Sequence, residues 1–342
     1  MTVEIIQGDA LEVLRTMDAE SVHCCVTSPP YYGLRCYGCE GQLGMESTPW
    51  EYLDRLVQVF AEVRRVLRDA GTLWLNLGDC YANDGKFGGE TGGKQAYLDA
   101  SDRKRVGREK RFTGLRPKNL IGIPWRAAFA LQEDGWNLRG DHVWGKPNGM
   151  PESVDDRPTR SHEYVFLFSK SDRYYYDSAA VRTGPKAVTI TRLAQDIESQ
   201  QGSTRAHNGT KTMKAVGRKS DKQRGHSRRH AGLNDRWDAM ERAEQIADGA
   251  NLRSVWWIPP AQCRESHFAV MPERVAQICI LAGCPEGGTV LDPFAGSGTT
   301  GILANRHGMS AILIEGDERY AAVARARLDG DAPLFANIEG AA

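Results

Sequence analysis

The sequence lacks a long apolar run, a signal-like N-terminus and a dense set of cysteines. No segment approaches the roughly 18 consecutive apolar residues that a membrane-spanning helix needs. Residues 1–4 do not begin the basic and then apolar pattern of a secretory signal. Eight cysteines in 342 residues are too few for a disulfide framework. We therefore expect a cytoplasmic protein in a reducing environment, with no membrane as its partner.

The chain also lacks net charge, because 44 Lys and Arg balance 44 Asp and Glu. This balance hides a basic segment at residues 182–230, which holds 12 Lys and Arg against 3 Asp and Glu. Such a segment is typical of contacts with a phosphate backbone, but it is equally typical of a solvated, disordered run of charges. Composition alone leaves both interpretations open.

Hydrophobic periodicity predicts that strands and helices alternate at both ends of the chain. We expect strands at residues 3–6, 22–27, 72–77, 141–144, 164–168, 289–291 and 311–314. Helices are expected at residues 49–67, 119–134, 272–282, 299–307 and 317–328. This alternation predicts an α/β fold with a mainly parallel sheet.

A glycine-rich motif occupies residues 291–301, between an expected strand and an expected helix. Gly296 and Gly298 would let backbone N–H groups and the helix N-terminus approach a ligand. With Gly301 they also match a dinucleotide motif, but only 41 residues follow, too few for the second half of such a fold. No Lys precedes Thr299, which excludes a phosphate-binding P-loop. Glu315, after the next strand, is placed to bind the ribose of an adenosine-containing cofactor. The alternative is a tight turn with incidental glycines.

A second motif, Ser28-Pro29-Pro30-Tyr31, directly follows a strand that we expect to be buried. The two prolines fix the backbone and remove two N–H donors. The turn therefore offers carbonyls, a hydroxyl and an aromatic face, which suits an amino group that must lose a proton. Stacking of a base on Tyr31 would contribute about 1–3 kcal/mol. By itself the pattern could also be an ordinary turn.

Taken together and in this order, the motifs resemble those of the amino-group DNA methyltransferases, in the beta-class arrangement with the catalytic turn first and the cofactor loop last. The resemblance covers most of the chain. It identifies Ser28, Pro29, Pro30 and Tyr31 as the catalytic motif. The residues that match cofactor-binding positions are Asp9, Ala10, His267, Phe268, Asp292, Pro293, Phe294, Gly296, Gly298, Thr299, Thr300 and Glu315. Residues 141–147 and 162–167 resemble motifs that border the target-base pocket, and we assign Lys146 to DNA binding.

The resemblance implies a doubly wound, mainly parallel sheet: the Rossmann-like, S-adenosylmethionine-dependent methyltransferase fold with a circularly permuted motif order. Residues 1–181 would form the catalytic half, with a mobile loop at 83–118, and residues 253–342 the cofactor-binding half. The basic insert at 182–252 would recognise the target, with Arg218, Lys219, Arg228 and Arg229 as its DNA-binding residues. In such a sheet Ser28 and Asp292 flank one crevice although they are 264 positions apart.

The resemblance further implies methyl transfer from S-adenosyl-L-methionine to an exocyclic amino group of double-stranded DNA, with the target base flipped out of the duplex. Ser28 Oγ and the Pro29 carbonyl would accept hydrogen bonds from that amino group. The turn contains no cysteine nucleophile, which argues strongly against methylation at C5 of cytosine. Serine at position 28 favours cytosine N4. Adenine N6, an RNA or protein amide target, and a DNA-binding protein with a vestigial cofactor site are the alternatives. A homodimer and a cognate restriction endonuclease remain open.

Cys36 and Cys39 form a C-x-x-C motif, which can hold zinc when a second pair of ligands is present. The sequence contains no second C-x-x-C, and Cys24 and Cys25 lie in a strand that we expect to be buried. We therefore expect no metal site.

Overall fold

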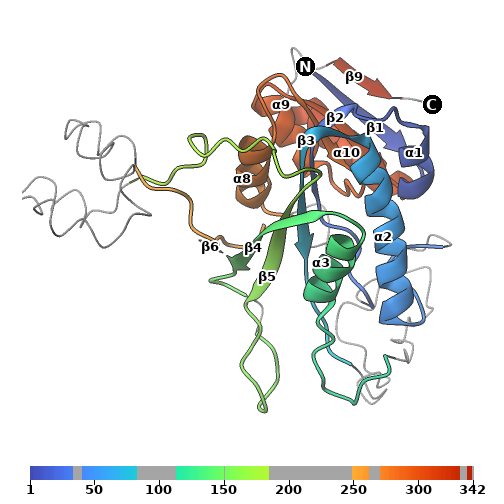
Figure 1. The fold of residues 1–342 in the computed structure, drawn as a ribbon, viewed down its shortest axis with the longest axis vertical. Helices are drawn as coiled ribbons and strands as arrows, with labels where there is room; N and C mark the ends of the chain where they lie inside the picture. Colours follow the sequence, from blue (N-terminus) through green and yellow to red (C-terminus); the bar gives the residue numbers. More distant parts are fainter. Residues whose placement is uncertain are drawn as a thin grey trace, which may run out of the picture. The chain divides into compact units, whose positions relative to one another are not determined.

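A computed structural model describes residues 1–33, 41–82, 113–149, 151–184, 249–261, 270–331 and 337–340, the last four through their backbone alone. The chain divides into two compact units. One consists of Met1–Asp177 together with Arg253–Ala342, and the other of Ser178–Leu252. All the elements below belong to the first unit (Figure 1). The roles that we assigned to the three parts of the chain stay predictions.

Nine strands of the described residues form one sheet, in the order β6-β4-β5-β3-β2-β7-β8-β1-β9. The strands are β1 Thr2–Gln7, β2 Val22–Thr27, β3 Leu67–Leu77, β4 Asn137–Gly145, β5 His162–Ser169, β6 Val255–Trp257, β7 Thr289–Asp292, β8 Ser310–Glu315 and β9 Asn337–Gly340. Within this sheet β5 pairs antiparallel with both β3 and β4, and all the other neighbouring strands are parallel. The predicted mainly parallel α/β sheet is confirmed.

The helices of the described residues are α1 Ala10–Thr16, α2 Pro49–Val66, α3 Ile123–Glu133, α8 Glu273–Gly283, α9 Thr299–Arg306 and α10 Glu318–Asp331. Helix α2 packs against α1 and α3, and α9 packs against α8 and α10. In Figure 1, α2 and α3 lie to one side of β3 and β5, and α8 lies to the other. Among the residues that the structure describes, no helix is both long and apolar enough to cross a membrane.

Helix α2 forms where the sequence predicts it, because its first turn satisfies its own backbone donors. Thr48 accepts a hydrogen bond from the Glu51 backbone N–H, and the Glu51 side chain accepts one from the Thr48 backbone N–H, both at 3.2 Å. Pro49, which lacks an N–H, occupies the first helical turn, where that donor would have no partner. This capping box fixes the start of α2, whose apolar face then packs onto the sheet.

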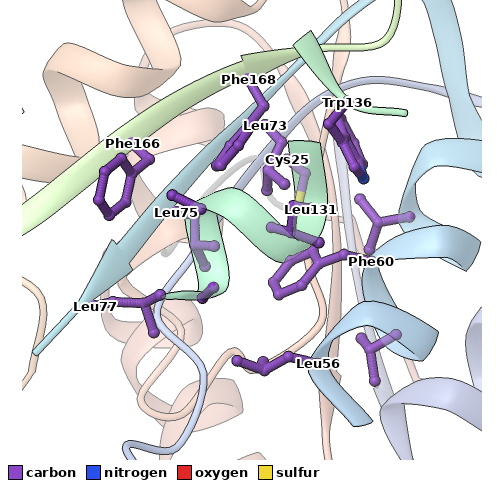
Figure 2. Packing of buried hydrophobic residues seen from close by; sticks show 14 of the residues in the cluster. Cys25, Leu56, Phe60, Leu73, Leu75, Leu77, Leu131, Trp136, Phe166 and Phe168 are labelled. Carbon is purple, nitrogen blue, oxygen red and sulfur yellow. The ribbon is translucent and has the colours of Figure 1, made fainter. Parts of the chain in front are cut away.

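The main core lies between helices α2 and α3 and the sheet, and it illustrates both periodicities of the sequence (Figure 2). Residues two apart on β3 and β5 point to one face, and residues three to four apart on α2 meet them. Each such fully buried leucine or phenylalanine contributes about 1.5–3 kcal/mol. The labelled members of this core include Leu56, Phe60, Leu73, Leu75, Leu131, Phe166 and Phe168.

All seven predicted strands and all five predicted helices are confirmed, but three predicted starts are wrong: β3 begins at Leu67 and not at residue 72, β4 begins at Asn137 and not at residue 141, and α3 does not begin at Asn119. The chain there is still extended, because Leu120 forms a β-bridge with Tyr81 and the Ile121 N–H donates to the Cys80 carbonyl. The helix begins after Gly122, whose φ of 81° breaks the extended run. The sequence did not predict α1, β6 or β9, which have only seven, three and four residues.

Candidate active site

The two predicted motifs meet at the centre of the sheet. Strands β2 and β7 are parallel neighbours, with Cys24 and Cys25 opposite Val290 and Leu291. At their carboxyl ends, Thr27 Oγ1 donates a hydrogen bond of 2.6 Å to Asp292 Oδ1. Ser28 follows Thr27 directly in the chain. The structure therefore brings Ser28 and Asp292 together, as the permuted order of the motifs predicts.

Asp292 supports the glycine loop from inside. Its side chain is buried, and besides the bond from Thr27 it accepts hydrogen bonds from Thr300 Oγ1 at 2.7 Å and from the Phe294 N–H at 3.1 Å. Burial raises the pKa of this carboxyl above its ordinary value, while these three bonds act in the opposite direction. Asp292 and Thr300, predicted as cofactor-binding, are thus engaged with the protein itself, and their contact with a cofactor stays a prediction.

The two glycines of the loop have different surroundings. Both adopt positive φ, 52° at Gly296 and 77° at Gly298, which L side chains rarely adopt. A Cβ at Gly296 would meet no atom within 4 Å, so this glycine borders open space. A Cβ at Gly298 would lie 2.9 Å from Ala324 Cβ of α10. We infer that Gly296 leaves room for a ligand and that Gly298 allows helix α10 to pack closely.

Glu315 connects the ends of three adjacent strands, β7, β8 and β1. Its Oε2 accepts a bond of 2.7 Å from the Gly296 N–H, its Oε1 one of 2.9 Å from the Asp317 N–H, and its carbonyl one of 3.0 Å from the Gly8 N–H. Burial raises the pKa of the Glu315 carboxyl, and the two backbone bonds oppose that shift. Each carboxylate oxygen can accept a further bond, so the geometry leaves capacity for a ribose hydroxyl.

The segment after β1 lies beside Glu315, because the Gly8 N–H donates to the backbone carbonyl of that residue. Asp9 is exposed and caps helix α1, because its Oδ1 accepts bonds from the Leu11 and Glu12 N–H groups at 2.9 and 3.1 Å. Ala10, the other predicted cofactor-binding residue here, is buried. The predicted cofactor residues that the structure describes thus gather at the carboxyl ends of β7, β8 and β1.

Arg327 of helix α10 holds the glycine loop, and sequence analysis did not single it out. Its Nη1 donates to the Ser297 carbonyl, to Ser297 Oγ at 2.8 Å and to Thr299 Oγ1 at 3.2 Å. The only signal in the sequence is an arginine on the predicted C-terminal helix, which resembles any solvated charge. Its role depends on the packing of α10 beside the loop.

The proline turn is held from two sides. Tyr52 Oη of α2 donates a hydrogen bond of 2.9 Å to the Pro30 carbonyl. On the other side, Gly78 follows β3, and a Cβ there would lie 2.5 Å from the Tyr31 ring. Any larger residue at position 78 would therefore displace this ring. Ser28 and Tyr31 are both half-buried, and Pro29 is buried.

Tyr31 is the centre of a polar network. Its hydroxyl lies 2.7 Å from Glu163 Oε2, 3.1 Å from Asn76 Oδ1 and 3.3 Å from Ser28 Oγ. Burial raises the pKa of the Tyr31 phenol well above its ordinary value, and the nearby Glu163 raises it further, so Tyr31 stays protonated. Asn76 is not among the residues that the motifs identify, although a polar residue within the apolar strand β3 is a signal that the sequence contains.

Lys146 was predicted to bind DNA, but its ammonium already has a partner. Its Nζ pairs with Glu163 Oε1 and lies 4.4 Å from the centroid of the Trp144 ring. Only 22% of its side chain is exposed. A phosphate would have to compete with this carboxylate, and the predicted DNA contact stays a prediction.

Several predicted residues lie outside the part of the chain that the structure describes. They are the cofactor residues His267 and Phe268, the DNA-binding residues Arg218, Lys219, Arg228 and Arg229, and the pair Cys36 and Cys39. Within the described residues, no three His, Cys, Asp or Glu side chains are grouped so that they could hold a metal ion.

Comparison with known proteins gives consistent results. The family model described as DNA methylase, for N6 and N4 methyltransferases, matches residues 22–326. The Type II methyltransferase M.SmaI of Serratia marcescens is 41% identical over 332 residues, which cover 95% of this chain and 90% of the relative. M.Cfr9I of Citrobacter freundii, also described as a Type II methyltransferase, is 40% identical over 332 residues, covering 96% of this chain and 88% of the relative.

Solved structures share the fold at low sequence identity. A DNA modification methylase of Thermus thermophilus, crystallised with S-adenosyl-L-methionine, superimposes with a TM-score of 0.56 at 23% identity over the whole of both chains. The cytosine-N4-specific PvuII DNA methyltransferase gives 0.57 at 18% identity, over 99% of this chain and 89% of that one. The fold is therefore that of the DNA methyltransferases. Since the family model spans most of the sequence and close relatives cover nearly all of it, the chain belongs to the DNA methylase family of N6 and N4 methyltransferases.

Proposed function

We propose that the protein transfers a methyl group from S-adenosyl-L-methionine to the N4 amino group of cytosine in double-stranded DNA. The observation that carries the choice of base is Ser28, a neutral hydroxyl at the first position of the proline turn, beside the glycine loop. The beta-class resemblance associates serine here with cytosine N4 and aspartate with adenine N6. The choice of base rests on this residue, because a fold shared with the PvuII enzyme does not identify the base that this protein methylates.

The residues at the ends of β7, β8 and β1 fit S-adenosyl-L-methionine. When bound, this cofactor supplies an electrophilic methyl group on a sulfonium. Gly296 borders open space, and Glu315 holds a carboxylate in a fixed orientation next to it, which suits ribose hydroxyls. The complex of the Thermus thermophilus methylase with this cofactor supports the assignment.

The proline turn would hold the amino group of the flipped base. Ser28 Oγ and the Pro29 carbonyl each accept a hydrogen bond from one N–H of this amino group, so that the nitrogen lone pair is directed at the methyl donor. Most of the rate enhancement would come from this orientation and from the fixed dipoles around the amine. The Tyr31 ring, which packs against Gly78, would stack on the base at the same turn.

The DNA partner is supported by the Type II methyltransferase relatives and by the basic segment at 182–230. We propose residues 182–252 as the target-recognition region, with Arg218, Lys219, Arg228 and Arg229 contacting phosphates. A cognate restriction endonuclease, a homodimer and the cytoplasmic location stay predictions.

The test is to sequence DNA from a host that has no methylation of its own and expresses the protein, with detection of modified bases. We expect N4-methylcytosine at one recurring sequence. A host that expresses Ser28→Ala is the matched control and should carry far less modification. N6-methyladenine as the only modified base would contradict cytosine N4 and leave the family assignment intact.

A further inference from the structure

The network around Tyr31 has a defined direction. A tyrosine hydroxyl has one proton, and the shortest contact of Tyr31 Oη is the one of 2.7 Å to Glu163 Oε2, against 3.1 Å to Asn76 Oδ1. A bond to a charged acceptor is also the stronger one. Tyr31 therefore donates its proton to Glu163. The bond of 3.3 Å between Ser28 and Tyr31 must then have Ser28 as its donor.

The surroundings of Glu163 keep it an acceptor. Lys146 Nζ pairs with its Oε1, and Asn76 Nδ2 donates to its Oε2 at 3.2 Å. The orientation of the Asn76 amide is set by a second bond, in which Nδ2 donates to the Tyr164 carbonyl at 3.0 Å. Besides Tyr31, two donors thus face the carboxylate, whose side chain is only 15% exposed. In these contacts the carboxylate oxygens act as acceptors.

The direction of the network matters for Ser28. A serine hydroxyl can donate one hydrogen bond and accept two. Once its proton points to Tyr31, it offers only lone pairs to any other group. An exocyclic amino group approaching the proline turn brings N–H donors and needs such lone pairs. A hydroxyl proton directed at the amine would instead face an N–H donor, and the two donors would repel each other.

We infer that Glu163 is a positioning residue for methyl transfer: through Tyr31 it fixes the Ser28 hydroxyl as a pure acceptor for the target amino group. This inference rests on the part of the proposed function in which Ser28 receives the amine. It holds for an amino group of cytosine or of adenine, because both present N–H donors. It assigns Glu163 a role in the reaction although its side chain reaches Ser28 only through Tyr31 and belongs to another strand.

Glu163→Gln tests the direction of the network. The amide can donate to Tyr31 Oη, which would turn the Tyr31 proton toward Ser28 and the Ser28 proton toward the amine. We expect the single-turnover rate of methyl transfer, at saturating DNA and cofactor, to fall about 10- to 100-fold, the range for loss of a hydrogen bond to a charged group. The KM for DNA and the affinity for cofactor should change less than about threefold.

The decisive control is the same substitution without the Tyr31 hydroxyl. Tyr31→Phe keeps the ring over Gly78 and breaks the network, so it should lower the rate by about tenfold. In that background Glu163→Gln should change the rate by less than about twofold, because Glu163 can no longer reach Ser28. Glu62→Gln, which removes a surface carboxylate paired with Arg65, is the matched control and should leave the rate unchanged.

The outcomes separate cleanly. An equal loss from Glu163→Gln in both backgrounds would overturn the inference, because Glu163 would then act through Lys146 or through the fold. An unchanged rate in the Glu163→Gln enzyme would overturn it as well. Should Glu163→Gln unfold, as seen by its thermal midpoint, Tyr31→Phe alone decides, and an unchanged rate contradicts the role of the network. The base that the wild-type enzyme methylates is determined separately, so a failed base choice does not alter this result.

Discussion

The two edges of the proposed active site are built by different means. At the ends of β7, β8 and β1, backbone N–H groups and a glycine at positive φ surround the carboxylate of Glu315. At the ends of β2 and β3, side-chain hydroxyls, an amide and a carboxylate form a network around Tyr31. Binding between fixed backbone groups is sensitive to small changes of shape. A side-chain network depends instead on the direction in which its protons point. Substitutions should therefore affect binding at the first edge and the rate of transfer at the second.

Removing the Ser28 hydroxyl should have the largest effect, and it should lower the rate of transfer without weakening the binding of the cofactor. Loss of one positioned hydrogen-bond donor from an oxyanion hole costs about 100- to 1,000-fold in rate, and we expect a loss of similar size for a positioned acceptor. We expect Ser28→Ala to lose that much single-turnover activity while its affinity for S-adenosyl-L-methionine, measured by calorimetry, stays within about twofold. If this variant binds the cofactor much more weakly, the two edges are not separate.

Valine at each of the two glycines should distinguish ligand space from helix packing at the first edge. Both variants place a side chain at positive φ, which costs about 1–2 kcal/mol. Gly296→Val fills the open space, and we expect the affinity for the cofactor to fall about 100-fold or more. Gly298→Val also presses on Ala324 of α10, so its free energy of unfolding should fall further, by about 1–3 kcal/mol.

Chemical denaturation and calorimetry measure these two effects on the same samples. Equal losses of stability in the two variants would show that the space above Gly296 is filled in solution. An unchanged affinity of Gly296→Val would place the cofactor elsewhere.

Arg327→Met should have a smaller effect, because it loosens the glycine loop but places no side chain in the open space beside Gly296. The variant keeps the aliphatic part of the side chain and removes the three bonds to Ser297 and Thr299. We expect the affinity for the cofactor to fall about threefold to tenfold, the size expected for one or two net hydrogen bonds. Arg325→Met on the same helix is the control. If both variants bound the cofactor with equal affinity, Arg327 would have no role in the cofactor site.

The smallest expected effect is a change of protein stability with pH, caused by one histidine on a strand near the second edge. His142 of β4 stacks on Trp256 with ring centroids 4.9 Å apart, and burial lowers its pKa although the bond to the Val165 carbonyl and nearby Asp141 act against this. The folded state thus favours neutral histidine. Stability from this group is present above the pKa of histidine in the unfolded chain, about 6.5, and is lost as the pH falls through the lower pKa of the folded state.

Urea denaturation at about pH 8 and about pH 5.5 measures this loss. The wild-type protein should lose more stability between these two values than His142→Gln, whose amide does not titrate. An identical loss in both proteins would show that His142 is accessible to protons in the folded state.

The sequence predicted the fold well because its signals there are local. Periodicity located the strands and helices, and the capping box at Thr48 and Glu51 fixed the start of α2. The two motifs also predicted that Ser28 and Asp292 meet, since ligands bind where parallel strands end at the centre of such a sheet. Short elements such as α1 and β6 gave too few residues for a period.

The internal organisation of the site could not be predicted, because it depends on contacts between distant segments. Glu163 reaches Tyr31 across 132 positions, through the register of the antiparallel strand β5 on β3. The difference between Gly296 and Gly298 arises from the packing of α10, and both glycines look alike in the motif. Lys146 looked like a free cation, and its pairing with Glu163 follows from strand pairing between β4 and β5.

The most direct test of methylation at cytosine N4 is nucleoside mass spectrometry of DNA methylated by the purified protein with a cofactor that carries an isotopically labelled methyl group. We expect labelled N4-methylcytosine, because the turn offers acceptors for an amino group and a neutral serine at its first position. Labelled N6-methyladenine alone would contradict the choice of base. Labelled 5-methylcytosine would contradict the role of the proline turn itself, since that reaction requires a cysteine nucleophile that the turn does not contain.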